Sequence, residues 1–266
     1  MIRTTPALAA LAVAVHLLVP GAGHAQEAQQ VPEWLLRLKL PNSAAKSVMT
    51  PTGWGAAYRS AYVGIGIAER SPYLSSTDGI IGFGYGMGDP VLGVGLQIGT
   101  TISDMSEFDN VSFSFKLHQY LARGTAIAFG GESLFSNNAL ADDAGNTFYL
   151  VVSHVLQGFG TKRQGVGRIH VSAGVGTGQF ARKSARDFSE GKGRNGTLAF
   201  GNLAIELIKN VNVTLEWSGT NLLTGMSTTI QIEQMPIALS VALADLTSYS
   251  GDGVRLVAAA AVAFSL

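Results

Sequence analysis

The sequence contains no cysteine, which excludes disulfides, thiolate metal sites and a cysteine nucleophile. Charged residues make up only 14% of the 266 positions, about half the share found in ordinary soluble domains. Lysine plus arginine and aspartate plus glutamate both number 18, so the basic excess typical of nucleic-acid binders is missing. The composition therefore argues against an ordinary cytosolic enzyme and against a nucleic-acid partner.

Long hydrophobic runs are missing as well. The longest apolar stretch, residues 7–19, is shorter than the roughly 17 to 25 residues that a membrane-spanning helix needs. It follows the positive charge of Arg3 and precedes Gly23-His24-Ala25, whose small residues suit a signal-peptidase site. We therefore predict a secretory signal peptide over residues 1–25, cleaved near Ala25, and no transmembrane helix in the rest of the chain.

After residue 50, the chain is rich in segments whose apolar residues occupy every second position. Residues 110–117 divide into an apolar set, Val111, Phe113, Phe115 and Leu117, and a polar set, Ser112, Ser114 and Lys116. Successive side chains of a strand point to opposite faces, so this pattern predicts a strand with one apolar and one polar face. The same division recurs at residues 168–176 and 210–218.

Glycine is frequent, at 33 residues, and in two segments it forms one face of a predicted strand. These faces are Gly82, Gly84 and Gly86 in the first segment and Gly93 and Gly95 in the second. Glycine is a poor strand residue, so its confinement to one face predicts a close approach or a crowded interior. Neither segment has the strand and helix context of a nucleotide-binding G-x-G-x-x-G motif, and we expect no cofactor.

About twelve alternating segments follow one another, beginning near residues 56, 79, 91, 110, 124, 146, 166, 197, 210, 221, 236 and 254. Alternation alone fits either a soluble barrel with an apolar interior or an outer-membrane barrel with an apolar exterior. The even number and the short connections after the second, fourth, eighth and tenth segments favour the membrane barrel. The predicted fold class is all-β: an antiparallel up-and-down transmembrane β-barrel of about 12 strands over residues 53–266.

Residues 26–52 precede this barrel and are predicted to form a periplasmic N-terminal segment. Their apolar residues are Trp34, Leu35, Leu36, Leu38 and Leu40, with Arg37 and Lys39 between them. The pattern is too short to distinguish a helix from a strand. Two placements therefore remain open: the segment plugs the lumen, or it lies against the periplasmic face.

Aromatic residues near the predicted strand ends suggest two belts at the membrane–water interfaces. The predicted aromatic girdle comprises Trp54, Tyr58, Tyr85, Tyr120 and Phe264 at the periplasmic rim and Phe135, Tyr149, Phe180 and Trp217 at the outer rim. The alternative is that these are core aromatics that happen to lie at strand ends.

Four segments carry a resemblance to a known family. They are residues 50–56 (TPTGWGA), 174–180 (GVGTGQF), 215–222 (LEWSGTNL) and 242–253 (ALADLTSYSGDG). Together the chain resembles, over most of residues 50–266, an uncharacterised bacterial family of presumed outer-membrane β-barrel proteins. The resemblance implies the fold and the outer-membrane location and supplies no catalytic residues.

Charged and polar residues that share the polar face of the predicted strands are expected to point into the lumen. These predicted lumen residues are Lys116, His118, Glu132, Arg168, His170, Glu206, Glu216 and Gln231. An arginine or lysine on the lipid face would cost about 2 to 4 kcal/mol at mid-depth, which favours the inward placement. Two interpretations stand side by side: a mixed-charge eyelet that selects small polar solutes, or a network of salt bridges that stiffens a closed barrel.

The sequence offers little for catalysis or metal binding. His118, His154 and His170 stand in no H-x-x-x-H or H-E-x-x-H spacing, and no G-x-S-x-G nucleophile motif occurs. We therefore predict no metal site and no catalytic residues. The loop at residues 180–196 carries Arg182, Lys183, Arg186, Lys192 and Arg194, which suit lipid phosphates, although an ordinary solvated loop is the favoured explanation.

The function expected from these features is a narrow passive channel for small polar solutes, or a structural membrane protein without catalysis. Its expected surroundings are outer-membrane lipids, and its folding is expected to need the barrel-assembly machinery. Two alternatives belong to other classes: a barrel enzyme that modifies outer-membrane lipid, and a soluble periplasmic binding barrel with an apolar pocket.

Overall fold

The computed structural model describes residues 47–56, 59–69, 78–104, 109–121, 124–136, 145–156, 168–183, 188–232, 235–247 and 253–265. The predicted signal peptide, residues 26–46 of the predicted N-terminal segment, Tyr58 and Arg186 lie outside these ranges. Within the described ranges, no helix has the length and hydropathy to cross a membrane.

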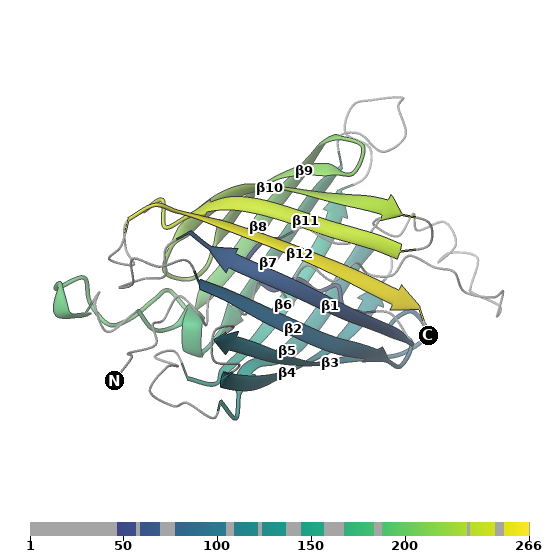
Figure 1. Ribbon diagram of the computed structural model, residues 1–266, viewed down its shortest axis with the longest axis horizontal. Coiled ribbons are helices and arrows are strands. Elements are labelled where there is room, and N and C mark those ends of the chain that lie inside the picture. Colours follow the sequence, from purple (N-terminus) through teal and green to yellow (C-terminus); the bar gives the residue numbers. More distant parts are fainter. Residues whose placement is uncertain are drawn as a thin grey trace.

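The elements are β1 (Ser60–Ala68), β2 (Asp78–Met87), β3 (Gly95–Asp104), β4 (Asp109–Leu121), β5 (Thr125–Leu134), β6 (Thr147–Leu156), β7 (Ile169–Gly176), the 3-10 helix η2 (Gly178–Phe180), β8 (Ala199–Ile208), β9 (Val211–Trp217), β10 (Leu222–Ile232), β11 (Met235–Ala244) and β12 (Arg255–Ser265). Each strand pairs antiparallel with its neighbours in sequence, and β1 closes the ring by pairing with β12 (Figure 1). The predicted twelve-stranded antiparallel barrel is thereby confirmed.

The two ends of the barrel differ in their connections. We call the end with the β2–β3, β4–β5, β8–β9 and β10–β11 turns the short-turn end. β1 begins there, and β12 brings the chain back to it (Figure 1). The opposite end is the long-loop end, where residues 177–198 connect β7 to β8.

The two strands that begin furthest from their predicted starts are β1 and β3, each four residues late. β3 starts at Gly95 rather than near residue 91, because the Asp89 side chain organises a turn. Its Oδ1 accepts hydrogen bonds from the N–H groups of Val91 (2.8 Å) and Leu92 (3.2 Å), which are then unavailable to a strand ladder. β1 starts at Ser60 rather than near residue 56, because residues 47–56 lie inside the barrel, as described below.

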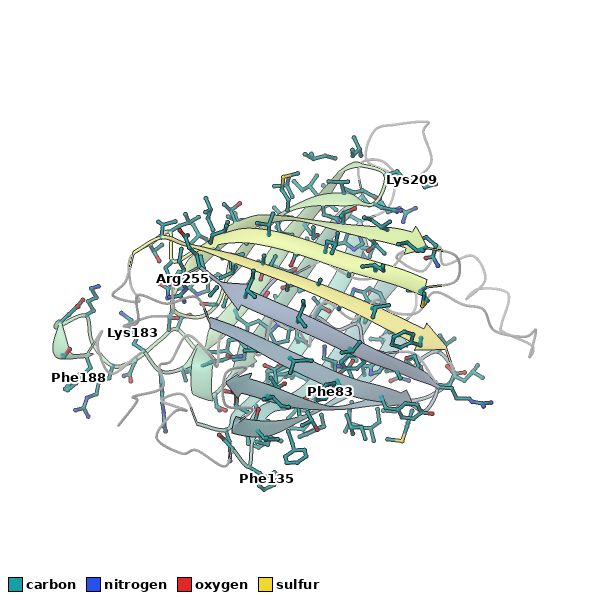
Figure 2. The ribbon with its side chains drawn as sticks, in the orientation of Figure 1. Phe83, Phe135, Lys183, Phe188, Lys209 and Arg255 are labelled. Atoms are coloured by element: carbon teal, nitrogen blue, oxygen red, sulfur yellow. The ribbon has the colours of Figure 1, made fainter. Side chains whose placement is uncertain are left out.

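The inner and outer faces of the barrel have opposite chemistry. In β6, Tyr149, Val151 and Ser153 are buried on the inner face, whereas Leu150 and Val152 are 46% and 44% exposed on the outer face. Side chains such as Phe83 project from the outside of the barrel (Figure 2). The wall thus turns its large apolar residues outward and its polar or small residues inward, which is the pattern of a lipid-embedded barrel.

The inner face of several strands consists of very small residues. β11 and β12 contribute Ala238, Ala242, Ala259, Ala261 and Ala263, and β2 contributes the predicted glycine face. A Cβ atom on Gly84 would overlap the ring of Tyr62, and one on Gly95 would lie 2.6 Å from the ring of His118. Glycine at these positions makes room for inward-pointing aromatic and imidazole rings, in agreement with the predicted crowded interior.

Candidate functional site in the barrel lumen

Residues 47–56, here called the lumen segment, run through the inside of the barrel. Their first residues bond to Glu216, next to the last residue of β9 at the long-loop end. Their last residue, Ala56, bonds to Gln97, near the start of β3 at the short-turn end. The lumen segment therefore spans most of the barrel's length before the chain enters β1.

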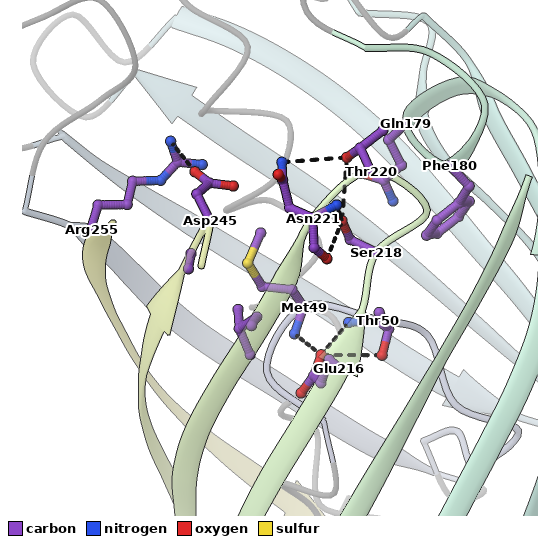
Figure 3. Close-up of a pocket in the computed structure, with 12 residues that line it drawn as sticks. Met49, Thr50, Gln179, Phe180, Glu216, Ser218, Thr220, Asn221, Asp245 and Arg255 are labelled. Carbon is purple, nitrogen blue, oxygen red and sulfur yellow. Dashed lines mark hydrogen bonds and ion pairs between the residues drawn. The ribbon is translucent and has the colours of Figure 1, made fainter. Parts of the chain in front are cut away.

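The carboxylate of Glu216 anchors the start of the lumen segment (Figure 3). The backbone N–H groups of Met49 and Thr50 each donate to Oε2 at 2.9 Å, and that of Val48 donates to Oε1. The hydroxyl oxygens of Ser47 and Thr50 lie 2.9 and 3.1 Å from Oε2. Glu216 is only 1% exposed, so this set of donors replaces water in stabilising a buried charge.

The rest of the lumen segment is bonded by polar side chains of three other strands. Ser153 Oγ accepts a hydrogen bond from Gly53 N–H (2.7 Å), and Gln97 Oε1 accepts one from Ala56 N–H (2.8 Å).

The carbonyl groups of the segment are bonded in the same way. Lys116 Nζ donates to the carbonyl oxygen of Trp54 (3.2 Å), and the Tyr120 hydroxyl donates to that of Gly55 (3.1 Å). The lumen side chains thus supply partners that a buried main chain otherwise finds in a sheet.

Two glycines allow the lumen segment to lie directly on the wall. A Cβ atom on Gly53 would lie 2.5 Å from the backbone oxygen of Ala126, and one on Gly55 would lie 2.5 Å from Nδ1 of His118. Between them, Trp54 packs on Tyr120 with ring centroids 5.1 Å apart. The Gly-Trp-Gly sequence therefore matches the local shape of the lumen.

An aromatic cluster lies in the lumen near the long-loop end. The rings of Phe180 and Phe200 stack with centroids 4.2 Å apart, and Tyr149 meets both edge-on. Phe180 reaches this place because η2 turns inward after β7. The glycines of β7 leave the space, since a Cβ atom on Gly176 would overlap the Phe180 ring.

A cavity of about 80 Å³ lies beside this cluster, above the anchor of the lumen segment (Figure 3). Its lining residues are Met49, Thr50, Gln179, Phe180, Glu216, Ser218, Thr220, Asn221, Leu223, Ala244, Asp245 and Arg255. The four sequence segments that carry the family resemblance all contribute to this lining. They lie far apart along the chain and meet at one place only in the folded barrel.

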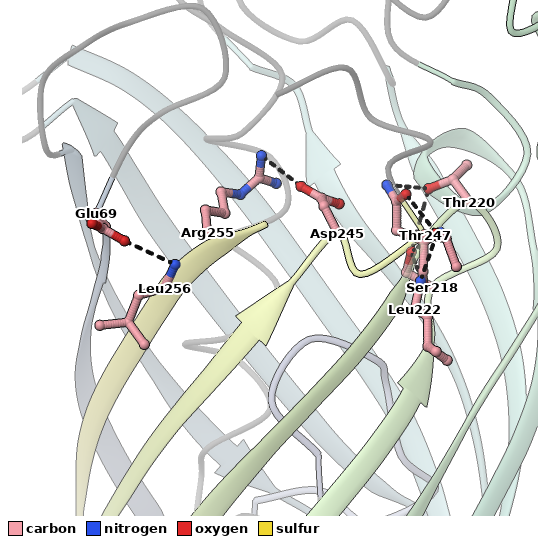
Figure 4. A network of polar contacts seen from close by, with 9 residues as sticks. Glu69, Ser218, Thr220, Leu222, Asp245, Thr247, Arg255 and Leu256 are labelled. Atoms are coloured by element: carbon pink, nitrogen blue, oxygen red, sulfur yellow. Dashed lines mark hydrogen bonds and ion pairs between the residues drawn. The ribbon is translucent and has the colours of Figure 1, made fainter. Parts of the chain in front are cut away.

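Buried polar contacts close the cavity on the side of β12. The Arg255 guanidinium lies 2.8 Å from the Asp245 carboxylate, and both side chains are almost completely buried (Figure 4). Beside this pair, Asn221 bonds within the β9–β10 turn, where its N–H donates to Ser218 Oγ (3.1 Å). These contacts hold the rim of the cavity in one arrangement.

The predicted lumen residues are on the inner register of their strands but do not form one ring. Lys116, His118, Glu132, His170, Glu206 and Glu216 are buried, Arg168 is half-buried, and Gln231 is exposed at the end of β10. Glu132 and Glu216 lie toward the long-loop end, whereas Glu206 pairs with Arg168 (3.8 Å) toward the short-turn end. The charges are therefore spread along the lumen rather than gathered at one constriction.

The predicted aromatic girdle needs correction at four positions. Tyr120, Tyr149 and Phe180 are buried inside the barrel, and Trp54 belongs to the lumen segment. Alternation already contained the signal for Tyr120, which shares its face with Lys116 and His118. The remaining described members, Tyr85, Phe135, Trp217 and Phe264, lie on the outer side, with Tyr85 and Phe264 near the short-turn end.

The basic residues of the β7–β8 loop are largely engaged within the loop, which extends beyond the long-loop end (Figure 2). Lys183 Nζ donates to the carbonyl oxygen of Lys192 (2.7 Å), and Lys192 Nζ lies 3.0 Å from Glu190. The Arg194 guanidinium lies 3.7 Å from the ring centre of Phe188. Arg182 forms a β-bridge with Asn195.

Histidine and carboxylate groups do not gather into a metal centre in the described part of the chain. His118 is buried against the lumen segment, and His154 Nδ1 lies 2.9 Å from Thr125 Oγ1. Several lumen residues were not predicted, and those that bond the lumen segment include Gln97, Ser153 and Asn202. Gln97 and Ser153 have the inward register, but nothing in the sequence shows that a distant segment would bond to them.

The closed antiparallel barrel, with its apolar exterior and its polar or small-residue interior, defines an outer-membrane type of β-barrel. No family model matches the sequence, and no curated protein matches it. Among solved structures, the chain is similar to the outer membrane protein Omp33 of Acinetobacter baumannii, with 10% identity, a TM-score of 0.40, and coverage of 79% of this chain and 98% of that chain. It is also similar to a double variant of OccD1 (OprD), with 10% identity, a TM-score of 0.32, and coverage of 77% and 65%.

Proposed function

We propose that this protein is an outer-membrane channel for small polar solutes, and that the lumen segment closes it in the present conformation. The observation that carries this proposal is the way the lumen segment is held. It is bonded to polar side chains along a polar lumen, and water can replace such hydrogen bonds when the segment leaves.

The distribution of apolar residues supports the membrane location. Large apolar side chains are exposed on the outer face of every part of the wall, including Ile65, Phe83, Phe113, Leu150, Val175, Leu215, Met226, Val241 and Leu256. A soluble binding barrel needs the reverse arrangement, with an apolar pocket inside. The outward apolar face favours insertion into a bilayer, with membrane lipids as the surrounding partners.

Strand number supports a narrow passage. Barrels of about eight strands have filled interiors, and barrels of sixteen to eighteen strands leave an open channel, so twelve strands lie between these cases. The small inner residues of β11 and β12 widen this part of the lumen. We therefore infer that removal of the lumen segment leaves a path for small polar solutes.

Conductance of the purified protein in planar lipid bilayers tests the proposal. The wild type is compared with Glu216→Ala, which removes the anchor of the lumen segment, and with Glu206→Gln, which changes another buried carboxylate that does not bond the segment. We expect discrete current steps that are more frequent in Glu216→Ala than in either other protein. Silence from all three proteins, with folding verified by heat-modifiable migration on a gel, would overturn the channel and leave a structural barrel.

A further inference from the structure

Most of the hydrogen bonds between the lumen wall and the lumen segment involve the main chain of the segment. The exceptions are the hydroxyl groups of Ser47 and Thr50, which bond Glu216, and Thr50 also accepts a hydrogen bond from Asn202. Glu216, Ser153 and Gln97 accept hydrogen bonds from the N–H groups of residues 48, 49, 50, 53 and 56. Lys116 and Tyr120 donate to the carbonyl groups of residues 54 and 55. These five side chains come from four strands and follow the path of one extended peptide.

Main-chain recognition of this kind depends little on the peptide's sequence. Every residue other than proline offers the same N–H and C=O groups, so side chains that bond them accept many sequences. Two of the wall side chains are also held by other wall residues. Gln97 Nε2 donates to the Tyr62 hydroxyl at 2.9 Å, and Ser153 Oγ lies 2.7 Å from Ser172 Oγ.

Sequence preference enters at a few positions. The hydroxyl groups of Ser47 and Thr50 bond Glu216, and positions 53 to 55 lie directly against the wall. Positions 53 and 55 admit no side chain, because a Cβ atom at either position would lie 2.5 Å from a wall atom. Position 54 suits an aromatic ring that packs on Tyr120. The lumen therefore fits an extended peptide that contains glycine, an aromatic residue and glycine in succession.

We propose that the lumen is a binding track for extended peptides and that residues 47–56 occupy it as a built-in ligand. If the protein is a channel, as proposed above, such peptides are its solutes. Peptide binding in the lumen does not depend on that proposal. The lumen segment continues directly toward β1, so its effective concentration is in the millimolar range or above. An added peptide therefore binds well only when the built-in segment cannot dock.

The test uses two full-length variants that keep every wall residue. Gly53→Leu with Gly55→Leu makes the lumen segment clash with the wall. The second variant replaces Val48, Met49 and Thr50 with proline, which removes the three N–H groups that bond Glu216. Heat-modifiable migration on a gel establishes that each variant is a folded barrel.

The probe is a fluorescein-labelled decapeptide with the sequence of residues 47–56, and its anisotropy is measured in detergent. We expect both variants to bind it at least tenfold more tightly than the wild type. A control peptide with leucine at the two glycine positions is expected to bind at least tenfold more weakly. A peptide that keeps Ser47, Thr50, Pro51 and Gly-Trp-Gly in place, with alanine elsewhere, is expected to bind within tenfold of the native sequence.

The outcomes separate the two proposals. Absence of binding to both folded variants, or equal binding of the leucine control, overturns the peptide track. Peptide binding without conductance in any variant leaves the track and overturns the channel. Conductance that the decapeptide does not block overturns peptides as the solute class, even when the channel itself stands.

Discussion

The anchor of the lumen segment can be tested with a single thiol, because the chain has no cysteine of its own. Thr52→Cys places the thiol in the middle of the lumen segment, where the native side chain is only 7% exposed. The perturbation is Glu216→Ala in this background. It removes the carboxylate that accepts hydrogen bonds from the N–H groups of Val48, Met49 and Thr50.

The expected magnitude follows from these three bonds. A hydrogen bond to a charged group contributes about 1.5 to 3 kcal/mol, and water that enters beside the alanine recovers part of the loss. Taking about 1.5 kcal/mol for each of the three N–H groups gives about 4 to 5 kcal/mol. Since 1.4 kcal/mol is a factor of ten, the undocked population of the segment rises about 1,000-fold.

The assay is the rate at which a methanethiosulfonate reagent modifies the thiol at position 52. We expect Glu216→Ala to raise this rate by about 1,000-fold, up to the rate of an exposed thiol. Glu216→Gln keeps one acceptor oxygen and should give a smaller increase. Glu206→Gln is the matched control and should leave the rate unchanged. A rate within twofold of the parent in a folded Glu216→Ala protein would refute the anchoring role of this carboxylate.

Three further predictions concern the wall and its rim. Gly55→Ala places a Cβ atom 2.5 Å from an imidazole of β4, so it should increase thiol modification at position 52 while the barrel stays folded. Val241→Arg puts a charge in the middle of the outer face of β11 and should lower the free energy of unfolding in lipid vesicles by about 2 to 4 kcal/mol. Phe135→Arg puts the same charge near the rim and should lower it by about 0 to 1 kcal/mol. Equal effects of these two changes in guanidinium titrations would contradict the membrane placement. Asp245→Asn keeps a residue that tolerates the positive φ of 62° but leaves Arg255 without its carboxylate. We expect the free energy of unfolding in the same titration to fall by about 3 to 5 kcal/mol. An unchanged free energy would show that the ion pair contributes nothing to stability.

The prediction of the wall succeeded because it rests on local patterns. Alternation is a property of neighbouring residues, so the strands, their number and the inward register of Lys116 or Glu216 follow from the sequence alone. The errors in the aromatic girdle have a related cause. Nearness to a strand end places Tyr120 and Tyr149 in the girdle, whereas odd or even position decides which face of the strand a side chain is on.

The lumen itself was much harder to predict. The motif at residues 50–56 (TPTGWGA) is recognisable in the sequence, but its role depends on contacts with residues far along the chain. Thr50 and Glu216 are 166 positions apart, and Gly53 and Ser153 are 100 apart. No local pattern records such pairs, so the Gly-Trp-Gly sequence can be explained only once the wall is in place.

The twelve alternating strands and the chemistry of the two barrel faces can therefore be predicted from the sequence alone, because each depends on residues within a few positions of one another. Three features follow from the folded barrel and not from local sequence: residues 47–56 cross the lumen, Glu216 holds them, and four distant segments line one cavity. These features depend on closure of the barrel. Pairing β1 with β12 brings inward-facing side chains from all strands around one axis, and their contacts across that axis have no counterpart in sequence spacing.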